Sequence, residues 1–283
     1  MGVCGASAVL KTRGHKAAHQ SASADTDQPL SNVGRRLLAR TWQARIDPPF
    51  CSLLCRAPGG LLSSTSTKAA VKFSTLIKDC ERAAVATDFE RHTLSNGACC
   101  FVRLLPGRPV VSLLSGLHGD ERVGPTLLHQ LMQRWARSRP PAVSLIVVPA
   151  LNDIGWDRYE RRWNRRDLND HFKSRFETPS RELALLYETL PVPDVHLDIH
   201  EDSTTPYPYI WLDVAGRRDD PPNRALATFM DCRVVLMRKP DKSSTHFMRR
   251  RGCLWTITSE VPPSWPLRDR LRWTSKVIRR ILH

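Results

Sequence analysis

The chain has 283 residues, of which 41% are hydrophobic and 25% are charged, as is ordinary for a globular protein with a sizeable core. It contains no apolar run of about 18 residues, so we expect no helix that spans a membrane. The formal net charge of +15 favours anionic partners, but no nucleic-acid-binding motif accompanies it and a solvated, arginine-rich surface explains it equally well. Nucleic acid is therefore not the expected partner.

The cysteines show no disulfide framework. They form no C-x-x-C pair, and no second pair or histidine pair completes a zinc knuckle around Cys51 and Cys55. We expect reduced thiols, several of them buried in strands, and a cytoplasmic protein.

Residues 1–68 differ in composition from the rest of the chain. They are rich in Ala, Ser, Arg and Leu, have few acids and show no sustained period. This composition is typical of a disordered basic arm or a targeting segment, and a start codon assigned too far upstream would also explain it. We therefore predict that the folded domain spans residues 69–283.

The folded part alternates between helical spacing and short apolar runs. In chain order we predict a helix over 71–86, strands over 97–105 and 110–116, a helix over 124–136 opening at Pro125, a strand over 143–151, a helix over 180–190 capped by Ser180, strands over 195–202 and 207–214, a helix over 223–230, strands over 232–237 and 253–261, and a closing basic helix over 266–283.

This alternation predicts an α/β fold with a mixed, mostly parallel central sheet and helices on both faces. In open sheets of this kind, ligands bind at the carboxyl ends of the strands. The polar clusters of this chain lie at those ends, so we examined them as candidate sites.

His118 and Glu121 form an H-x-x-E pair in the turn that follows the strand over 110–116. Alone, such a pair also fits a solvated turn. Gly116, Gly119 and Gly124 surround it and allow a tight bend and close approach to a ligand. His200, at the end of a later strand, would complete the two-histidine, one-glutamate set that holds a hydrolytic zinc and leaves one position open.

The segment RRWNRRDLNDHF, residues 161–172, is a second candidate, although a basic surface loop is the simpler explanation. Asp167 could accept a hydrogen bond from the far nitrogen of a ligand histidine and fix its tautomer. Arg162 could polarise a carbonyl and stabilise an oxyanion. Asn169 could bind a polar substrate group.

Glu260 ends the last predicted strand. Next to a metal-activated water, its carboxylate could act first as general base and then as general acid. The alternative is a surface glutamate at the strand exit. His196 shares a strand face with His200, and we expect it to lie in the core or behind the site.

The segments HGDERVG, RWNRRDLND, DIHED and TSEVP, in that order, resemble the zinc metallocarboxypeptidase superfamily, which includes the succinylglutamate desuccinylase/aspartoacylase branch. The resemblance covers roughly residues 70–283. It implies a carboxypeptidase-like (phosphorylase/hydrolase-like) fold and one zinc ion per chain.

By position, the resemblance assigns zinc ligation to His118, Glu121 and His200. It also assigns the histidine-orienting acid to Asp167 and the catalytic glutamate to Glu260. The remaining assignments concern the arginine-rich segment: Arg162 for the polarising arginine, and Asn169 with Arg165 for substrate binding.

One position departs from the family pattern. Asp170 stands where the family has an arginine that grips a terminal carboxylate, and an acid would repel that group.

The resemblance as a whole implies a zinc-dependent metallohydrolase that cleaves an amide bond in a small peptide or an N-acyl amino acid. The alternative is a catalytically impaired protein of this fold that binds an anionic partner.

Overall fold

The computed structural model describes residues 71–213, 233–236 and 242–282. The predicted arm over 1–68 and the predicted helix over 223–230 lie outside these ranges. No helix within them combines the length and the apolar character that crossing a bilayer requires.

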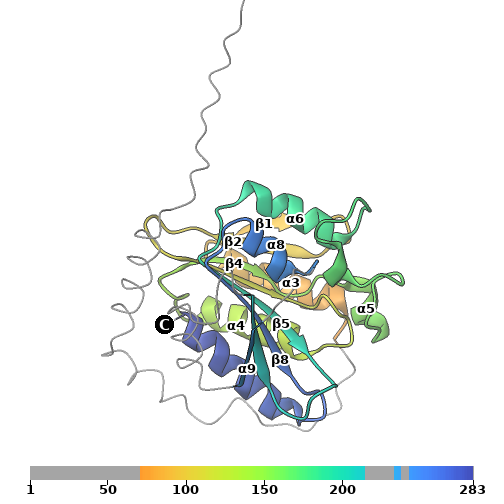
Figure 1. The fold of residues 1–283 in the computed structure, drawn as a ribbon. Coiled ribbons are helices and arrows are strands. Elements are labelled where there is room, and N and C mark those ends of the chain that lie inside the picture. Colours follow the sequence, from red (N-terminus) through yellow and green to blue (C-terminus); the bar gives the residue numbers. More distant parts are fainter. Residues whose placement is uncertain (1–70, 214–232, 237–241, 283) are drawn as a thin grey trace, which may run out of the picture.

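The described residues form one eight-stranded mixed sheet in the order β1-β2-β4-β3-β5-β8-β6-β7 (Figure 1). The four neighbouring strands β4, β3, β5 and β8 run parallel. The antiparallel pairs are β1 with β2, β2 with β4, and β6 with β8. The strands are β1 Glu90–Thr93, β2 Cys99–Arg103, β3 Val110–Ser115, β4 Ser144–Val148, β5 Val195–Glu201, β6 Tyr209–Asp213, β7 Arg233–Leu236 and β8 Trp255–Val261.

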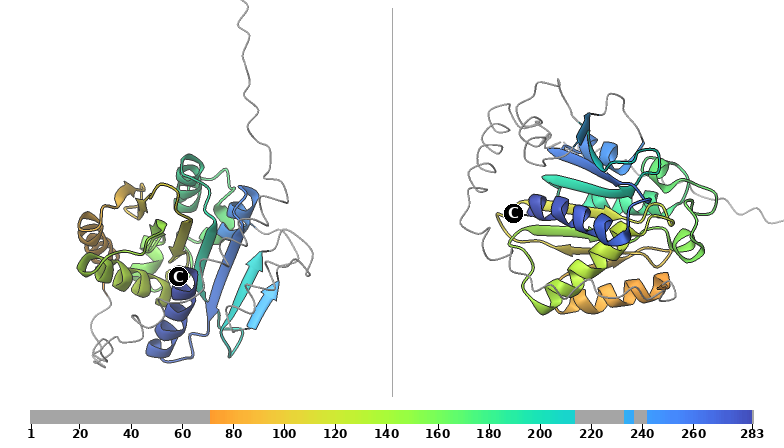
Figure 2. Two further views of the ribbon diagram at one scale, coloured as in Figure 1. Left: turned by 90° about the vertical axis from the view of Figure 1, so that its left-hand side faces the viewer. Right: turned by 90° about the horizontal axis from the view of Figure 1, so that it is seen from below.

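Helices cover both faces of this sheet. The helices α4 and α9 lie on one face with α3 beside α4, and α6 and α8 lie on the other (Figures 1 and 2). The predicted α/β fold with a mixed, mostly parallel sheet covered on both faces is thus confirmed. The helices are α3 Phe73–Val85, α4 Val123–Arg137, α5 Asp153–Arg158, the 3-10 helix η1 Leu168–His171, α6 Pro179–Thr189, α8 Ser244–Arg250 and α9 Leu267–Leu282.

The predicted cap of α6 is wrong. Thr178 is the capping residue, and its Oγ1 accepts a hydrogen bond from the Arg181 N–H at 3.2 Å. Ser180 lies inside the first turn, after Pro179 at the favoured first position.

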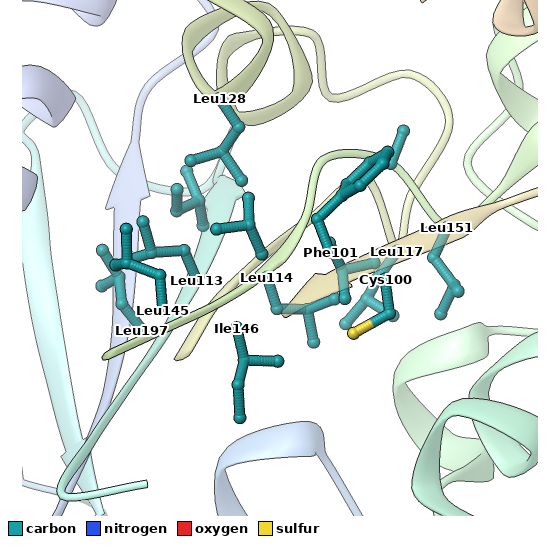
Figure 3. Close-up of a cluster of buried hydrophobic side chains, with 14 of the residues drawn as sticks. Cys100, Phe101, Leu113, Leu114, Leu117, Leu128, Leu145, Ile146, Leu151 and Leu197 are labelled. Atoms are coloured by element: carbon teal, nitrogen blue, oxygen red, sulfur yellow. The ribbon is translucent and has the colours of Figure 1, made fainter. Parts of the chain in front are cut away.

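The core fills the space between the sheet and its helices. Strands β3 and β4 are buried on both faces and carry continuous apolar runs, as central parallel strands should. Figure 3 shows Leu113 and Ile146 of these strands and Leu128 of α4 among the buried hydrophobic side chains, with Ile146 on the opposite side of the sheet from Leu128. Each fully buried side chain of this size contributes about 1.5–3 kcal/mol. The cysteines in the described ranges are buried and unpaired, as expected: Cys80, Cys99, Cys100 and Cys253.

The strand order fixes where a ligand can bind. From β3 the chain first crosses to β4 on one side and later returns to β5 on the other. The connections leaving β3 and its neighbour therefore diverge at the carboxyl ends of β3 and β5, and a ligand-binding crevice is expected at such a point of an open α/β sheet.

Candidate metal centre

The turn between β3 and α4 carries His118 and Glu121 to this crevice, and glycines make its path possible. Gly116 has a φ of 68°, in the left-handed region that favours glycine. A Cβ on Gly119 would lie 2.0 Å from the carbonyl carbon of Gly155. These glycines thus allow the turn to pack closely against the neighbouring chain.

Three buried side chains converge in the crevice. His118 Nδ1 lies 2.6 Å from Glu121 Oε1, and His200 Nδ1 lies 2.9 Å from Glu121 Oε2. The two Nδ1 atoms are 3.2 Å apart. One ligand atom from each residue falls within 4.8 Å of the others, so the three could hold one metal ion. The structure therefore brings together the residues that the sequence singled out.

Each histidine has a carboxylate behind it. His118 Nε2 lies 2.9 Å from Asp167 Oδ1, as the sequence predicted for this acid. His200 Nε2 lies 3.2 Å from Asp198 Oδ1, a partner that the sequence reasoning missed. The signal was available, because residues two apart in a strand share a face and Asp198 precedes His200 by two. Carboxylates in this place orient ligand histidines and raise their basicity.

Glu121 has two further donors. Arg161 Nη1 donates to Glu121 Oε1 at 2.9 Å, and the Glu201 N–H donates to Glu121 Oε2 at 3.1 Å. Arg161, rather than the predicted Arg162, is thus the arginine that reaches the cluster. Both side chains at Arg162 and Arg165 are exposed, and neither contacts the cluster within the described part of the chain.

A tight turn explains this placement. Trp163 and Arg166 exchange backbone hydrogen bonds of 2.9 and 2.8 Å around Asn164 and Arg165, whose φ values of 47° and 69° are both positive. Two positive φ values in a two-residue loop are typical of a type I′ hairpin turn. The hairpin carries Arg165 at its tip and brings Arg161 back toward Asp167, with 4.0 Å between Nε and Oδ2.

Asn169 and Asp170 lie just beyond the hairpin. The Asn169 N–H donates to Asp167 Oδ1 at 3.0 Å, and its side-chain Oδ1 accepts from the Ser244 N–H at 3.3 Å. These contacts give Asn169 a role in holding Asp167 and α8 in place. Asp170 is exposed, and its backbone N–H donates to the Asp167 carbonyl.

Glu260 lies beside the cluster on the neighbouring strand. It is opposite His200 in the parallel β5–β8 register and opposite Tyr209 in the antiparallel β6–β8 register. Its Oε2 is buried without a hydrogen-bond partner among the described residues. Burial raises the pKa of Glu260 to about 8; His200 opposes this shift, and Glu121 and other nearby acids add to it. A carboxyl with a pKa near neutrality suits proton transfer.

The charges of the cluster favour a bound cation. Burial alone would lower the pKa values of both histidines. At His118, the carboxylates of Asp167 and Glu121 outweigh burial and raise the pKa. At His200, Asp198 and Glu121 have the same effect. Burial would likewise raise the pKa of Glu121, but His200 and His118 hold it well below its usual range. The site attracts positive charge, which protons or a metal ion can supply.

An open, mostly parallel sheet with two histidines and a glutamate at its strand ends defines the carboxypeptidase-like class of α/β proteins. The catalytic domain of the succinylglutamate desuccinylase/aspartoacylase family matches residues 108–283, and the chain belongs to that family. This membership supports a hydrolase.

Solved structures share the fold at low sequence identity. The metallo-carboxypeptidase from Burkholderia cenocepacia has a TM-score of 0.64 at 15% identity, covering 75% of this chain and 68% of that one. A candidate metallopeptidase from Shewanella denitrificans OS217 has a TM-score of 0.62 at 18% identity, covering 74% and 88%. The succinylglutamate desuccinylase/aspartoacylase from Rhodobacter sphaeroides has a TM-score of 0.52 at 22% identity, covering 69% and 63%. No curated protein matches the sequence.

Proposed function

We propose that this chain is a zinc-dependent amidohydrolase whose catalytic domain spans residues 69–283. The observation that carries the proposal is the convergence of His118 Nδ1, His200 Nδ1 and the Glu121 carboxylate within 4.8 Å, in a buried site. Family membership supports hydrolysis as the reaction. Reduced, buried thiols such as Cys100 support a cytoplasmic location.

The donor set fits zinc. Two imidazole nitrogens and one carboxylate are the protein ligands of many hydrolytic zinc sites, whereas magnesium and calcium prefer oxygen alone. The second nitrogen of each histidine already faces a carboxylate, as zinc-bound histidines usually do. When bound, zinc supplies Lewis acidity, which polarises a carbonyl and makes water a nucleophile near neutral pH.

Glu260 performs the proton transfers in this proposal. Its carboxylate takes a proton from the attacking water as the C–O bond forms, and it delivers that proton to the leaving nitrogen as the C–N bond breaks. Its position opposite His200 supports this role, as does its Oε2, which has no hydrogen-bond partner among the described residues. Water and amide are consumed, and a carboxylic acid and an amine are released.

Arg161 is our choice for the group that stabilises the developing oxyanion. It already reaches Glu121, and its side chain remains half exposed. Arg162 was assigned by resemblance and stays the alternative. The two differ by one position, so paired substitutions can decide between them.

We propose that the substrate is a small peptide or an N-acyl amino acid. Asp170 is exposed where the family arginine would stand and cannot pair with a terminal carboxylate. Arg165, at the exposed hairpin tip, is the nearby cation that we propose takes over this contact, with Asn169 beside it.

The decisive experiment measures zinc content and hydrolysis on the same preparations. We expect about one zinc per chain in the wild type, and cleavage of C-terminal peptides or of N-acyl amino acids. Glu260→Gln should retain the zinc and lose about 10²–10⁴-fold in turnover. An Asp170→Arg variant in the same screen shows whether the missing arginine sets the substrate.

Two results would sink the proposal. A wild-type chain that takes up no zinc contradicts the metal site, and a fully active Glu260→Gln variant contradicts the proton-transfer role. A metal-free protein that binds an anionic polymer with a steep salt dependence would favour the alternative of a binding protein, which the net charge of +15 would serve.

A further inference from the structure

A continuous set of buried polar side chains lies behind His200, between the sheet and the helices α6 and α8. The Tyr187 hydroxyl is 3.2 Å from Ser112 Oγ, which is 3.0 Å from His196 Nδ1. On the other side of that imidazole, Nε2 is 3.3 Å from Ser244 Oγ, which donates to Asp198 Oδ2. All five side chains are essentially inaccessible to solvent. None of them is required by the proposed reaction itself.

The donors and acceptors in this set allow only one direction for each of its hydrogen bonds. The buried carboxylate of Asp198, which lies 3.2 Å from His200 Nε2, can only accept hydrogen bonds. The single proton of the Ser244 hydroxyl therefore points to Asp198, and Ser244 Oγ must accept from His196 Nε2. Burial lowers the pKa of His196 to about 4, so the ring is neutral and its Nδ1 accepts from Ser112. Tyr187 then donates to Ser112.

This series of hydrogen bonds ends at the metal centre. Ser244 holds one oxygen of Asp198, and the other oxygen lies 3.2 Å from His200 Nε2, as a charge contact rather than an aligned hydrogen bond. A fixed carboxylate there favours the tautomer with the proton on Nε2. The lone pair of His200 Nδ1 then points toward Glu121 and His118, as ligation requires.

Ser244 also contacts the support of the other histidine. Its backbone N–H donates to Asn169 Oδ1 at 3.3 Å, and the Asn169 N–H donates to Asp167 Oδ1 at 3.0 Å. Asp167 in turn faces His118 Nε2. One residue at the start of α8 is thus joined to the carboxylates behind both histidines.

We propose that Ser244 is a positioning residue for the metal centre, which fixes Asp198 and thereby the tautomer and orientation of His200. The inference rests on the proposed zinc site. It predicts that metal affinity depends on a hydroxyl that touches neither the metal nor the substrate.

The test compares zinc affinity in four proteins by competition with a chromogenic chelator, and records the visible spectrum after cobalt substitution. The variants are Ser244→Ala, Ser244→Thr, which keeps the hydroxyl, and Ser180→Ala. Ser180 is a matched control, because it is equally buried in a first helical turn but its hydroxyl has no partner among the described residues. Ser243, not Ser244, caps α8 through the His246 N–H, so alanine at 244 should leave the helix intact.

We expect Ser244→Ala to weaken zinc binding about ten-fold, at the lower end of the effect of outer partners of metal ligands, and to alter the cobalt spectrum. Ser244→Thr should restore most of the affinity, and Ser180→Ala should match the wild type. If the wild type binds zinc and Ser244→Ala binds it equally well, this inference is wrong and the proposed function stands. If the wild type binds no zinc, the proposed function fails as well.

A second variant guards against misfolding at position 244. Ser112→Ala removes the hydrogen bond to His196 Nδ1 at the far end of the set, next to Tyr187. It should weaken zinc binding in the same direction and by less than Ser244→Ala. If Ser244→Ala misfolds, unchanged zinc affinity in Ser112→Ala contradicts the proposed positioning role.

Discussion

Arg161 and Arg162 are neighbours in the chain with very different surroundings. Arg161 reaches the Glu121 carboxylate, whereas Arg162 is exposed and has no contact with the cluster in the part of the chain that is described. Four arginines lie within six residues of this segment, so sequence position alone cannot select one. The hairpin turn at Asn164 and Arg165 selects it, because the turn determines which side chains face inward.

Paired alanine substitutions test this assignment. Arg161→Ala should lower kcat/KM about 10²-fold or more, because a donor to the developing oxyanion is lost. Arg162→Ala should stay within about three-fold of the wild type, as exposed positions usually do. Steady-state kinetics on both variants, with zinc content measured, would check it. A larger loss in Arg162→Ala would return the role to that residue.

At the scale of elements, a buried ion pair ties α9 to the site. Arg270 of α9 pairs with Glu201, which directly follows His200, and Glu201 Oε1 accepts from the Val123 N–H at the start of α4 at 2.6 Å. The side chains of Arg270 and Glu201 are 15% and 4% exposed, so the loss of one partner leaves the charge of the other buried and unpaired. A carboxylate at the amino end of α4 also suits the helix dipole.

Removal of this arginine should destabilise the whole domain. We expect Arg270→Ala to lower the free energy of unfolding by about 3 kcal/mol, because the buried Glu201 carboxylate loses its cation. Arg272→Ala, an exposed position on the same helix, is the matched control and should change stability by less than about 0.5 kcal/mol. Urea denaturation of both variants measures the difference, and equal stabilities would show that the ion pair contributes nothing.

At the scale of the whole molecule, Glu260 makes stability depend on pH. Its pKa is raised from an ordinary value of 4.5 to about 8 in the folded chain. The native state therefore holds a proton that the unfolded state has lost. The stabilisation is complete below pH 4.5 and disappears as pH rises through about 8.

Glu260→Gln removes this dependence. In zinc-free protein, the variant should gain stability relative to the wild type as pH rises from about 5 to about 9, by a few kcal/mol at most. Denaturation of both proteins at the two pH values, with a chelator present, isolates the contribution of this residue. A stability difference that stays constant across the range would show that Glu260 titrates as an ordinary surface glutamate.

The amino-acid sequence by itself determined the layers of the molecule. The apolar run of β4 is visible locally, because the centre of a strand buried on both faces is largely apolar, whereas the equally buried β5 alternates apolar residues with His196, Asp198 and His200. The H-x-x-E spacing and the position of His200 at a strand end were visible as well, because both are local features of the sequence. Short elements such as β1 and α5 carried too few apolar residues to show a period.

Only the tertiary structure decided which polar groups meet. The Ser244 contacts joined α8 to β5 and η1, and the Arg270–Glu201 pair joined α9 to β5. A charged or hydroxyl side chain has no local period and pairs with whatever the fold brings within about 3 Å. The sequence could therefore name the residues that hold a metal and the acid Asp167 that orients His118, whereas the contacts of Ser244 and Arg270 depended on packing.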